Sequence, residues 1–171
     1  MDAKERRTML VERLRSTDSP ITGKVLAQEL KVSRQIVVGD IAILRAAGLN
    51  IYATPQGYIL SEPKKSTNIV ATLPCKHGMD GLEQELNIIV DNGGKVLDVI
   101  VEHAIYGELK GNLMLASRRD VADFMHKLQV GGAEPLCSIT SGVHLHTVEA
   151  PSLDVLLRIK EELQKNGILL N

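Results

Sequence analysis

Residues 21–48 read ITGKVLAQELKVSRQIVVGDIAILRAAG and contain the signals for two helices joined by a very short turn. Thr22 can cap the first helix and Ser33 the second, because a short hydroxyl side chain accepts hydrogen bonds from the free N–H groups of a helix start. Gly48 suits the position just after the second helix, where a left-handed backbone is common. The three-residue turn 31–33 between the helices therefore predicts a helix-turn-helix.

The segments on either side of this stretch extend the pattern. Residues 3–15 (AKERRTMLVERLR) have the apolar spacing of a basic helix with one packing side. After the helix-turn-helix, IYAT (51–54) and GYIL (57–60) flank Pro55 and Gln56, which is a hairpin pattern. A hairpin in this place would form a wing, so the sequence predicts a winged helix-turn-helix.

Polar, proline-containing residues follow the hairpin in the sequence SEPKKSTN. We interpret residues 62–68 as a linker between a first domain, 1–61, and a second domain, 69–171. Residues 1–65 carry 11 Lys and Arg against 7 Asp and Glu, whereas the whole chain has a net charge of -1. This uneven charge suggests that the first domain is cationic and binds a polyanion, and that the second domain has a different function.

Composition narrows the function classes further. Aromatic residues make up 2% of the chain and Trp is absent, so a base-stacking surface for single-stranded nucleic acid is not expected. The sequence has no apolar stretch of membrane-spanning length and no signal-peptide pattern, and we expect a cytoplasmic protein without membrane contact. Cys75 and Cys137 form no CxxC pair and do not indicate a disulfide framework.

The first domain resembles the winged helix-turn-helix of bacterial repressors, on the stretch quoted above followed by the pattern IxATPxGYxL. The resemblance implies that double-stranded operator DNA is the partner and that the second helix lies in its major groove. It implies Ser33, Arg34 and Gln35 as DNA contacts, with Gln56 at the tip of the wing. Gly39 departs from the usual long polar residue and Gln56 from the more common Arg, so two DNA contacts of the family are in doubt. Alternatively, the module binds only protein or dimerises.

The second domain alternates between strand and helix patterns. This order, β-α-β-β-α-β with an added helix and short strand, predicts an α+β chain whose second domain is ferredoxin-like. The expected elements are strands at 68–74, 95–103, 108–116 and 142–150 and helices at 80–91, 118–130 and 151–165, followed by a short strand.

Two histidines one residue apart, His144 and His146, should point to the same side of the last strand. In the usual strand order 4-1-3-2, that strand lies antiparallel beside the first one, so both rings would meet His77. Glu85 borders the apolar stripe of helix 80–91, where an unpaired carboxylate is costly and a cation would remove the cost. Three imidazoles and one carboxylate suit Zn, Ni, Fe or Mn, and the donor types do not choose among them. The alternative is that these histidines only pack or lie exposed on the strand.

The stretches CKHGMDGLEQELNIIVDNGGKVLDVIVEHAIYGEL, SRRDV and SGVHLHTVEAP resemble the 3H domain, which is fused to this winged helix in NiaR-type niacin-responsive repressors. The resemblance runs from about Arg6 to Leu170. It implies that nicotinic acid acts as a co-repressor of genes for niacin uptake and NAD biosynthesis. It also implies a divalent metal, nickel or zinc ahead of iron or manganese. The ligands that it implies are His77, Glu85, His144 and His146.

Effector contacts are predicted at two places. In the expected topology the third strand is parallel to the first, so Arg118 and Arg119 begin their helix near the metal and one of them could clamp the nicotinate carboxylate. His103 and Tyr106 belong to the family pattern HxxYG, in which Ala104-Ile105 here replaces the commoner Pro-Val. The same topology places His103 at the opposite edge from the metal, where it could cap a turn or approach an effector across a dimer interface.

The sequence leaves three functional interpretations: a repressor, an enzyme and a metal-sensing regulator. A palindromic operator requires a two-fold protein, so we expect a homodimeric repressor rather than an enzyme. The His/Glu set also resembles a hydrolase or dioxygenase site, and biotin ligases carry a similar winged helix, but we find no phosphate loop or nucleophile motif. A regulator that senses the metal itself is the other alternative, and its operator binding would follow the ion alone.

Overall fold

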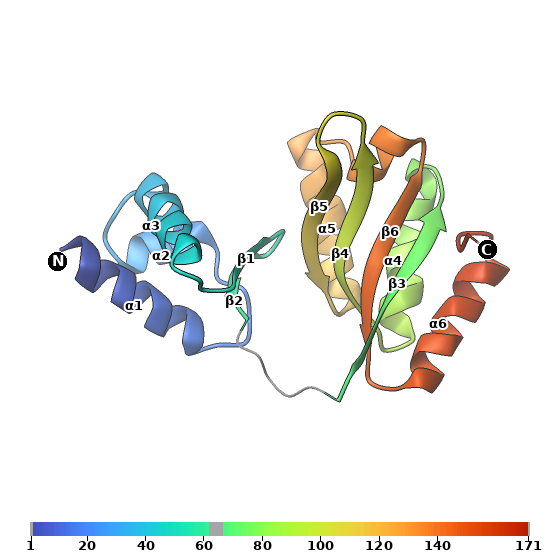
Figure 1. Ribbon diagram of the computed structural model, residues 1–171, viewed down its shortest axis with the longest axis horizontal. Helices are drawn as coiled ribbons and strands as arrows, with labels where there is room; N and C mark the ends of the chain where they lie inside the picture. The colour runs from blue at the N-terminus through green and yellow to red at the C-terminus, as the bar shows by residue number, and fades with distance from the viewer. Residues whose placement is uncertain (1, 62–66, 171) are drawn as a thin grey trace. The chain divides into compact units, whose positions relative to one another are not determined.

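The computed structural model describes residues 2–61 and 67–170. It divides into two compact units, Met1–Lys65 and Ser66–Asn171, which are described separately (Figure 1). Most of the predicted linker, residues 62–66, lies outside the described residues. The mixture of helices and strands confirms the predicted α+β class.

The first unit has the predicted helix-turn-helix and hairpin. Thr22 Oγ1 accepts a hydrogen bond from the N–H of Val25 at 3.3 Å, and Ser33 Oγ accepts one from Ile36 at 3.3 Å, so both predicted N-caps are present. Gly48 follows the second helix with φ +92°. The elements are α1 (Ala3–Arg15), α2 (Gly23–Glu29), α3 (Arg34–Ala46), β1 (Ile51–Thr54) and β2 (Gly57–Leu60).

Helix α3 is fixed to α1 by a buried ion pair. The carboxylate of Asp40 is 3% exposed and receives Nε of Arg6 at 2.6 Å and Nη2 of Arg6 at 3.2 Å. Val37 and Ile41 turn the same side of α3 into the apolar core. The orientation of α3 therefore depends on α1 as well as on the core.

The wing is held to the start of the helix-turn-helix through its backbone. Ile21 and Tyr58 exchange two backbone hydrogen bonds of 2.8 Å. Gly57 has φ +138°, and a side chain there would collide with the carbonyl of Ile21. Glycine is therefore required at this position of the wing.

The second unit follows the predicted β-α-β-β-α-β order, with two short 3-10 segments in addition. Its elements are β3 (Ile69–Lys76), η1 (Met79–Gly81), α4 (Leu82–Asp91), β4 (Lys95–His103), β5 (Gly107–Leu115), α5 (Arg118–Gly131), η2 (Leu136–Thr140), β6 (Val143–Ala150) and α6 (Leu153–Lys165).

The strand order corrects the prediction. Within residues 67–170 the sheet has the order β3-β6-β4-β5 with antiparallel neighbours throughout, so the first and fourth strands are adjacent as predicted but the ferredoxin-like order 4-1-3-2 is wrong. The inward side chains of β6 are all buried, which suits a central strand, whereas β5 carries exposed Glu108 and Lys110, which suit an edge. Because β6 separates β3 from β4, these two run in the same direction and end at the same edge of the sheet.

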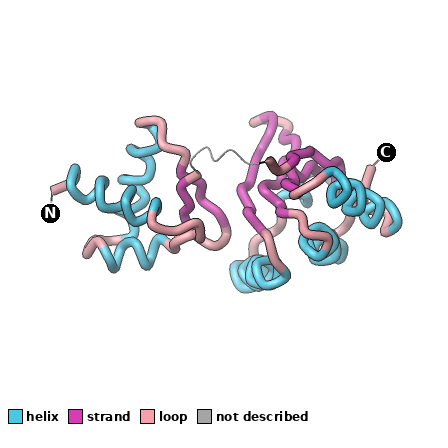
Figure 2. Tube along the Cα trace, turned by 90° about the horizontal axis from the view of Figure 1, so that it is seen from below, coloured by secondary structure: helices cyan, strands magenta, loops and turns pink. Residues whose placement is uncertain are grey.

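Helices α4, α5 and α6 pack against one face of this sheet (Figure 2). After α6 the chain returns to β3, where Leu170 N–H donates to the carbonyl of Pro74 at 2.9 Å and Lys76 N–H donates to Ile168 at 2.8 Å. The predicted short last strand is thus a bridge on the outer edge of β3. None of the helices in the described part of the chain is long and apolar enough to cross a membrane.

Candidate metal centre and nucleic-acid interface

The pairing of β3 with β6 brings the predicted metal ligands into one place. Cys75 lies opposite His144 and Leu73 lies opposite His146, so both imidazoles stand beside the end of the first strand. Their spacing of two residues turns both rings towards the helices, and they are 2% and 1% exposed. Glu85, on the inner side of α4, is 0% exposed.

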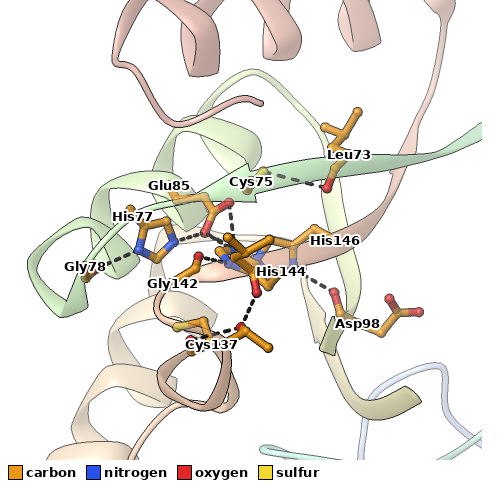
Figure 3. Close-up of polar contacts among 12 residues, drawn as sticks. Leu73, Cys75, His77, Gly78, Glu85, Asp98, Cys137, Gly142, His144 and His146 are labelled. Atoms are coloured by element: carbon orange, nitrogen blue, oxygen red, sulfur yellow. Dashed lines mark hydrogen bonds and ion pairs between the residues drawn. The ribbon is translucent and has the colours of Figure 1, made fainter. Parts of the chain in front are cut away.

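All four predicted ligands meet at the carboxylate of Glu85 (Figure 3). The distances from its Oε2 are 2.5 Å to Nε2 of His77, 3.0 Å to Nε2 of His144 and 3.3 Å to Nε2 of His146. The neighbouring ring centroids are 4.8 Å apart for His77 and His144 and 4.8 Å apart for His144 and His146. The three rings therefore surround one oxygen atom from different sides.

Each ring is oriented by its other nitrogen. A main-chain carbonyl can only accept a hydrogen bond, so each Nδ1 that contacts one carries the proton. In the neutral ring this leaves a lone pair on Nε2, which is the arrangement typical of metal-binding histidines. The three pairs are His77 Nδ1 with Gly78 O at 2.6 Å, His144 Nδ1 with Gly142 O at 2.9 Å, and His146 Nδ1 with Asp98 O at 2.7 Å.

The charges of the cluster depend on one another. Burial alone would raise the pKa of Glu85, but the surrounding imidazoles hold the pKa of this carboxyl well below its usual range. Burial alone would lower the pKa values of His77 and His146, but the Glu85 carboxylate outweighs it and both are raised. Without a metal, the carboxylate of Glu85 and a protonated imidazole of His77 or His146 would therefore stabilise each other.

The donor set fits a divalent transition metal. Nε2 of His146 is buried and makes no hydrogen bond of good geometry within the described residues, although it lies 3.3 Å from Glu85. A buried nitrogen in this condition is costly, and a cation would satisfy it. Imidazole nitrogens with one carboxylate oxygen are common ligands of Zn, Ni and Fe.

Cys75 is a neighbour of this cluster that the sequence analysis did not include. Its Sγ, a carboxylate oxygen of Glu85 and a ring nitrogen of His144 all lie within 4.8 Å of one another. Burial, reinforced by the Glu85 carboxylate, raises the pKa of the Cys75 thiol. The sequence pattern could have indicated this neighbour. Cys75 lies two residues before His77, so both side chains face the core if the strand continues past Pro74.

The start of α3 forms the candidate DNA surface. Arg34 and Gln35 are exposed, and the hydroxyl of Ser33 caps the helix as predicted. Further along, Ile36 and Ile43 are 41% and 52% exposed. Exposed aliphatic side chains on a recognition helix can contact thymine methyl groups, so Ile36 and Ile43 are candidate apolar contacts beside the polar ones.

Gln56 does not lie as an exposed tip of the wing. Its amide nitrogen and oxygen are both buried and have no hydrogen-bond partner within the described residues. The side chain belongs to a groove that Lys24 and Arg34 also line. A DNA contact by Gln56 would therefore require this side chain to turn outwards.

Two families match this chain: a helix-turn-helix domain over residues 6–59 and the 3H domain over residues 70–171. The chain is 42% identical to the probable transcription repressor NiaR of Thermotoga maritima over 166 residues, which cover 97% of this chain and 94% of that protein. It is 38% identical to the transcription repressor NadR of Bacillus subtilis over 167 residues, which cover 96% of this chain and 93% of that protein. The chain belongs to the NiaR-type transcription repressors. Both named relatives are repressors and not enzymes, so this member of the NiaR-type family is a DNA-binding transcription repressor, and the expectation that it is no enzyme is confirmed.

In this NiaR-type chain the predicted arginines lie away from the His/Glu cluster. The third strand is antiparallel to the first, so α5 begins at the opposite edge of the sheet, and the reason for placing Arg118 and Arg119 near the metal is wrong. Arg118 forms a two-pronged ion pair with Asp91, at 2.7 and 2.5 Å, beside the far end of α4. Arg119 is exposed in the same first turn.

His103 lies at the same edge as the cluster, not at the opposite one, because β3 and β4 end together. Its Nδ1 accepts hydrogen bonds from the N–H groups of Ile105 and Tyr106 at 3.1 and 3.2 Å, so it caps the turn between β4 and β5. Tyr106 stacks near this ring and is 75% exposed. In this member of the family, both residues therefore shape a turn rather than the interior of the site.

Proposed function

We propose that this repressor binds a divalent transition metal in its 3H domain and uses nicotinic acid as co-repressor for genes of niacin uptake and NAD biosynthesis. The observation that carries the metal part is the orientation of three imidazoles. His77, His144 and His146 each donate Nδ1–H to a main-chain carbonyl and turn Nε2 towards one buried carboxylate. Nickel and zinc are the first candidates for such a set, with iron and manganese as alternatives.

When bound, the metal would supply a positive charge and a coordination position for an anion. Glu85 would neutralise part of that charge, and the imidazoles would fix the direction from which the ligand approaches. Nicotinate is a planar pyridine with a carboxylate, so either its ring nitrogen or its carboxylate can serve as a donor.

DNA binding would depend on how the two copies in a homodimer present their α3 helices. A palindromic operator requires two recognition helices related by a two-fold axis, about one helical turn of DNA or a multiple of it apart. Nicotinate would act by favouring the dimer arrangement that fits this spacing. To change the population from mostly inactive to mostly active, it must bind the active arrangement several kcal/mol more tightly.

Operator gel shifts test this function. The full chain is titrated onto promoter DNA of a niacin-uptake gene with Ni²⁺, with Ni²⁺ and nicotinate, and with nicotinate and a chelator. We expect tight binding only when metal and nicotinate are present together. Binding that follows the metal alone, with no response to nicotinate, would favour the alternative of a metal-sensing regulator, for which the buried cluster would suffice.

A further inference from the structure

Helix α3 is apolar on its exposed side beyond its first turn. After Gln35 it has two polar residues, Asp40 and Arg45. The Asp40 carboxylate is 3% exposed and belongs to the buried ion pair with α1. Nε of Arg45, in the last turn, donates to the carbonyl of Ile51 at 2.6 Å. The exposed residues between Gln35 and Arg45 are Ile36, Val38, Gly39, Ala42 and Ile43. The middle of the helix therefore presents apolar groups to a partner.

Two of these side chains are large and lie on one side of α3. Ile36 and Ile43 are seven residues apart, which is about two helical turns, so they point in nearly the same direction. They are 41% and 52% exposed, whereas Val37 and Ile41 on the core side are 0% and 1% exposed. The two exposed isoleucines contribute little to the core of this unit, so their apolar surface is available to a partner.

Gly39 lies between the two isoleucines, about one turn from each. A Cβ atom at this position would meet nothing within 4 Å among the described residues, so the packing of the unit does not require glycine here. The backbone of Gly39 is helical, and in a helix interior glycine is less stable than alanine. Glycine does allow a backbone to approach a ligand closely. The exposed side of α3 thus combines two large aliphatic side chains with a gap between them.

We propose that Ile36 and Ile43 read thymine methyl groups of the operator, and that Gly39 lets the backbone of α3 approach the base edges between them. In the major groove thymine is distinguished from cytosine by its methyl group, which aliphatic side chains contact. Seven residues span about 10 Å of helix, or about three base-pair steps, so the two side chains would reach different base pairs. The proposal thus assigns part of the sequence preference of this repressor.

Operator DNA is the partner that fits this surface best. The chain belongs to a family of DNA-binding repressors, and α3 is the second helix of the matched helix-turn-helix domain. At the start of the same helix, Arg34 and Gln35 are exposed and can contact base edges or phosphates. Polar readout at the start of α3 would therefore continue as apolar readout in its middle.

Replacing thymidine by deoxyuridine in the operator tests the two isoleucines, because the base pairs stay the same and the methyl groups are lost. The operator is the best site that the full chain selects from a random-sequence DNA library with nickel and nicotinate present. By fluorescence anisotropy we expect the wild type to bind the uridine DNA at least about tenfold more weakly. The double variant Ile36→Ala, Ile43→Ala should bind the thymidine DNA weakly as well, and should lose less than about twofold more on uridine replacement.

The matched control is Met9→Ala, which removes an apolar side chain of α1 that is 47% exposed. It should respond to uridine replacement as the wild type does. Equal binding of both DNAs by the wild type, or the same loss in the wild type and the double variant, would overturn the inference. A selection that enriches no thymine would do so too. If the double variant loses affinity for both DNAs alike and no longer dimerises in analytical ultracentrifugation, the isoleucines contact protein instead of DNA.

Gly39→Leu tests the close approach of the helix. The new side chain would enter open space, and leucine is the better helix former, so the first unit should be at least as stable to urea as in the wild type. Operator binding should nevertheless fall at least about tenfold. Gly131→Leu is the control, since a Cβ atom there also meets nothing within 4 Å among the described residues. Wild-type operator affinity in Gly39→Leu would contradict the close approach.

Discussion

The carboxylate of Glu85 lies 3.0 Å from Nε2 of His144, although the two residues are 59 positions apart in the chain. Neither residue has access to solvent that could stabilise its charge. A buried carboxylate is tolerated only beside positive charge or hydrogen-bond donors, and here imidazoles from two other segments surround it. This contact joins α4 to β6 and makes the cluster both a structural element of the second unit and a candidate metal site.

Glu85→Gln should weaken metal binding strongly. The substitution keeps the shape of the side chain but removes the charge that attracts the cation. At a few Å, that attraction is worth several kcal/mol at the effective dielectric constant of about 20 that describes even buried sites, so we expect the nickel affinity to fall at least about a hundredfold. Competition with a chelator of known affinity measures it. His126→Ala, an exposed histidine outside the cluster, is the control and should retain the wild-type affinity.

The stability of the metal-free protein should depend on pH in a characteristic way. The pKa values of His77 and His146 are raised above their ordinary 6.5, so their contribution to the free energy of unfolding is complete below 6.5 and is lost as pH rises through the raised values. The pKa of Glu85 is lowered from its ordinary 4.5, so its contribution is present above 4.5 and is lost as pH falls through the lowered value. The cluster should therefore stabilise the metal-free fold most between 4.5 and 6.5.

With metal bound, the trend above that window should reverse. A metal competes with protons for the imidazoles, so its affinity rises as they lose their protons. Thermal unfolding of the second unit, followed from about pH 5 to about pH 8 with chelator and with Ni²⁺, separates the two cases. A metal-free protein whose second unit gains stability from pH 6.5 upwards would contradict the assigned ion pair.

Asp40→Ala should destabilise the first unit. The substitution leaves the partly exposed guanidinium groups of Arg6 and Arg7 without their buried carboxylate partner, so we expect a loss of more than about 1 kcal/mol in the free energy of unfolding. Glu29→Ala is the matched control, since its pair with Arg13 has both side chains 40% exposed. That loss should stay below about 1 kcal/mol. Urea unfolding monitored by circular dichroism gives both values. Similar losses in the two variants would mean that the Arg6–Asp40 ion pair stabilises the unit no more than the exposed Arg13–Glu29 pair does.

Arg34→Ala should weaken operator binding. The exposed guanidinium at the start of α3 is placed for a base edge or a phosphate, and its loss should cost about 1–3 kcal/mol of binding free energy. If Arg34 contacts a phosphate, its loss should also reduce the slope of log K against log salt concentration by about one. If it contacts a base, its loss should relax the sequence preference at one position of the operator. Fluorescence anisotropy with operator DNA at several salt concentrations distinguishes these. Arg119→Ala should behave as wild type, and an unchanged Arg34→Ala would remove Arg34 from the DNA surface.

Local chemistry made much of this structure predictable. Thr22 and Ser33 are good N-caps wherever they precede an apolar helix pattern, and both cap helices here. The spacing of His144 and His146 placed them on one side of a strand, and the position of Glu85 within an apolar stripe indicated its burial. Such features depend on periods of 2 and 3.6 residues, which a single sequence contains.

The order of strands in the sheet was not predictable in this way. Which strands become neighbours depends on packing across the whole unit, and the usual order for a β-α-β-β-α-β chain was wrong here. The error carried over to Arg118 and His103, because each was assigned to an edge of the sheet through that order. The placement of the predicted metal ligands was unaffected, since it depends only on the first and fourth strands being adjacent.

The sequence did not reveal Cys75 as a neighbour of the cluster, nor the apolar cavity that His144, His146 and Leu136 line, for different reasons. The predicted first strand ended at Pro74, whereas β3 continues to Lys76. Because β3 is the outer strand of the order β3-β6-β4-β5, a residue without an N–H is tolerated within it. Leu136 lies in a segment without helical or strand periodicity, so nothing local indicated that it would form a cavity wall.

Calorimetry of nicotinate binding to the full chain, before and after removal of its metal, tests the central claim most directly. A chain in which His77, Glu85, His144 and His146 hold one cation for the effector should bind nicotinate when loaded with nickel, lose that binding after chelation, and regain it when nickel is restored. Equal nicotinate binding by the chelated protein would contradict a role for the cluster in effector recognition.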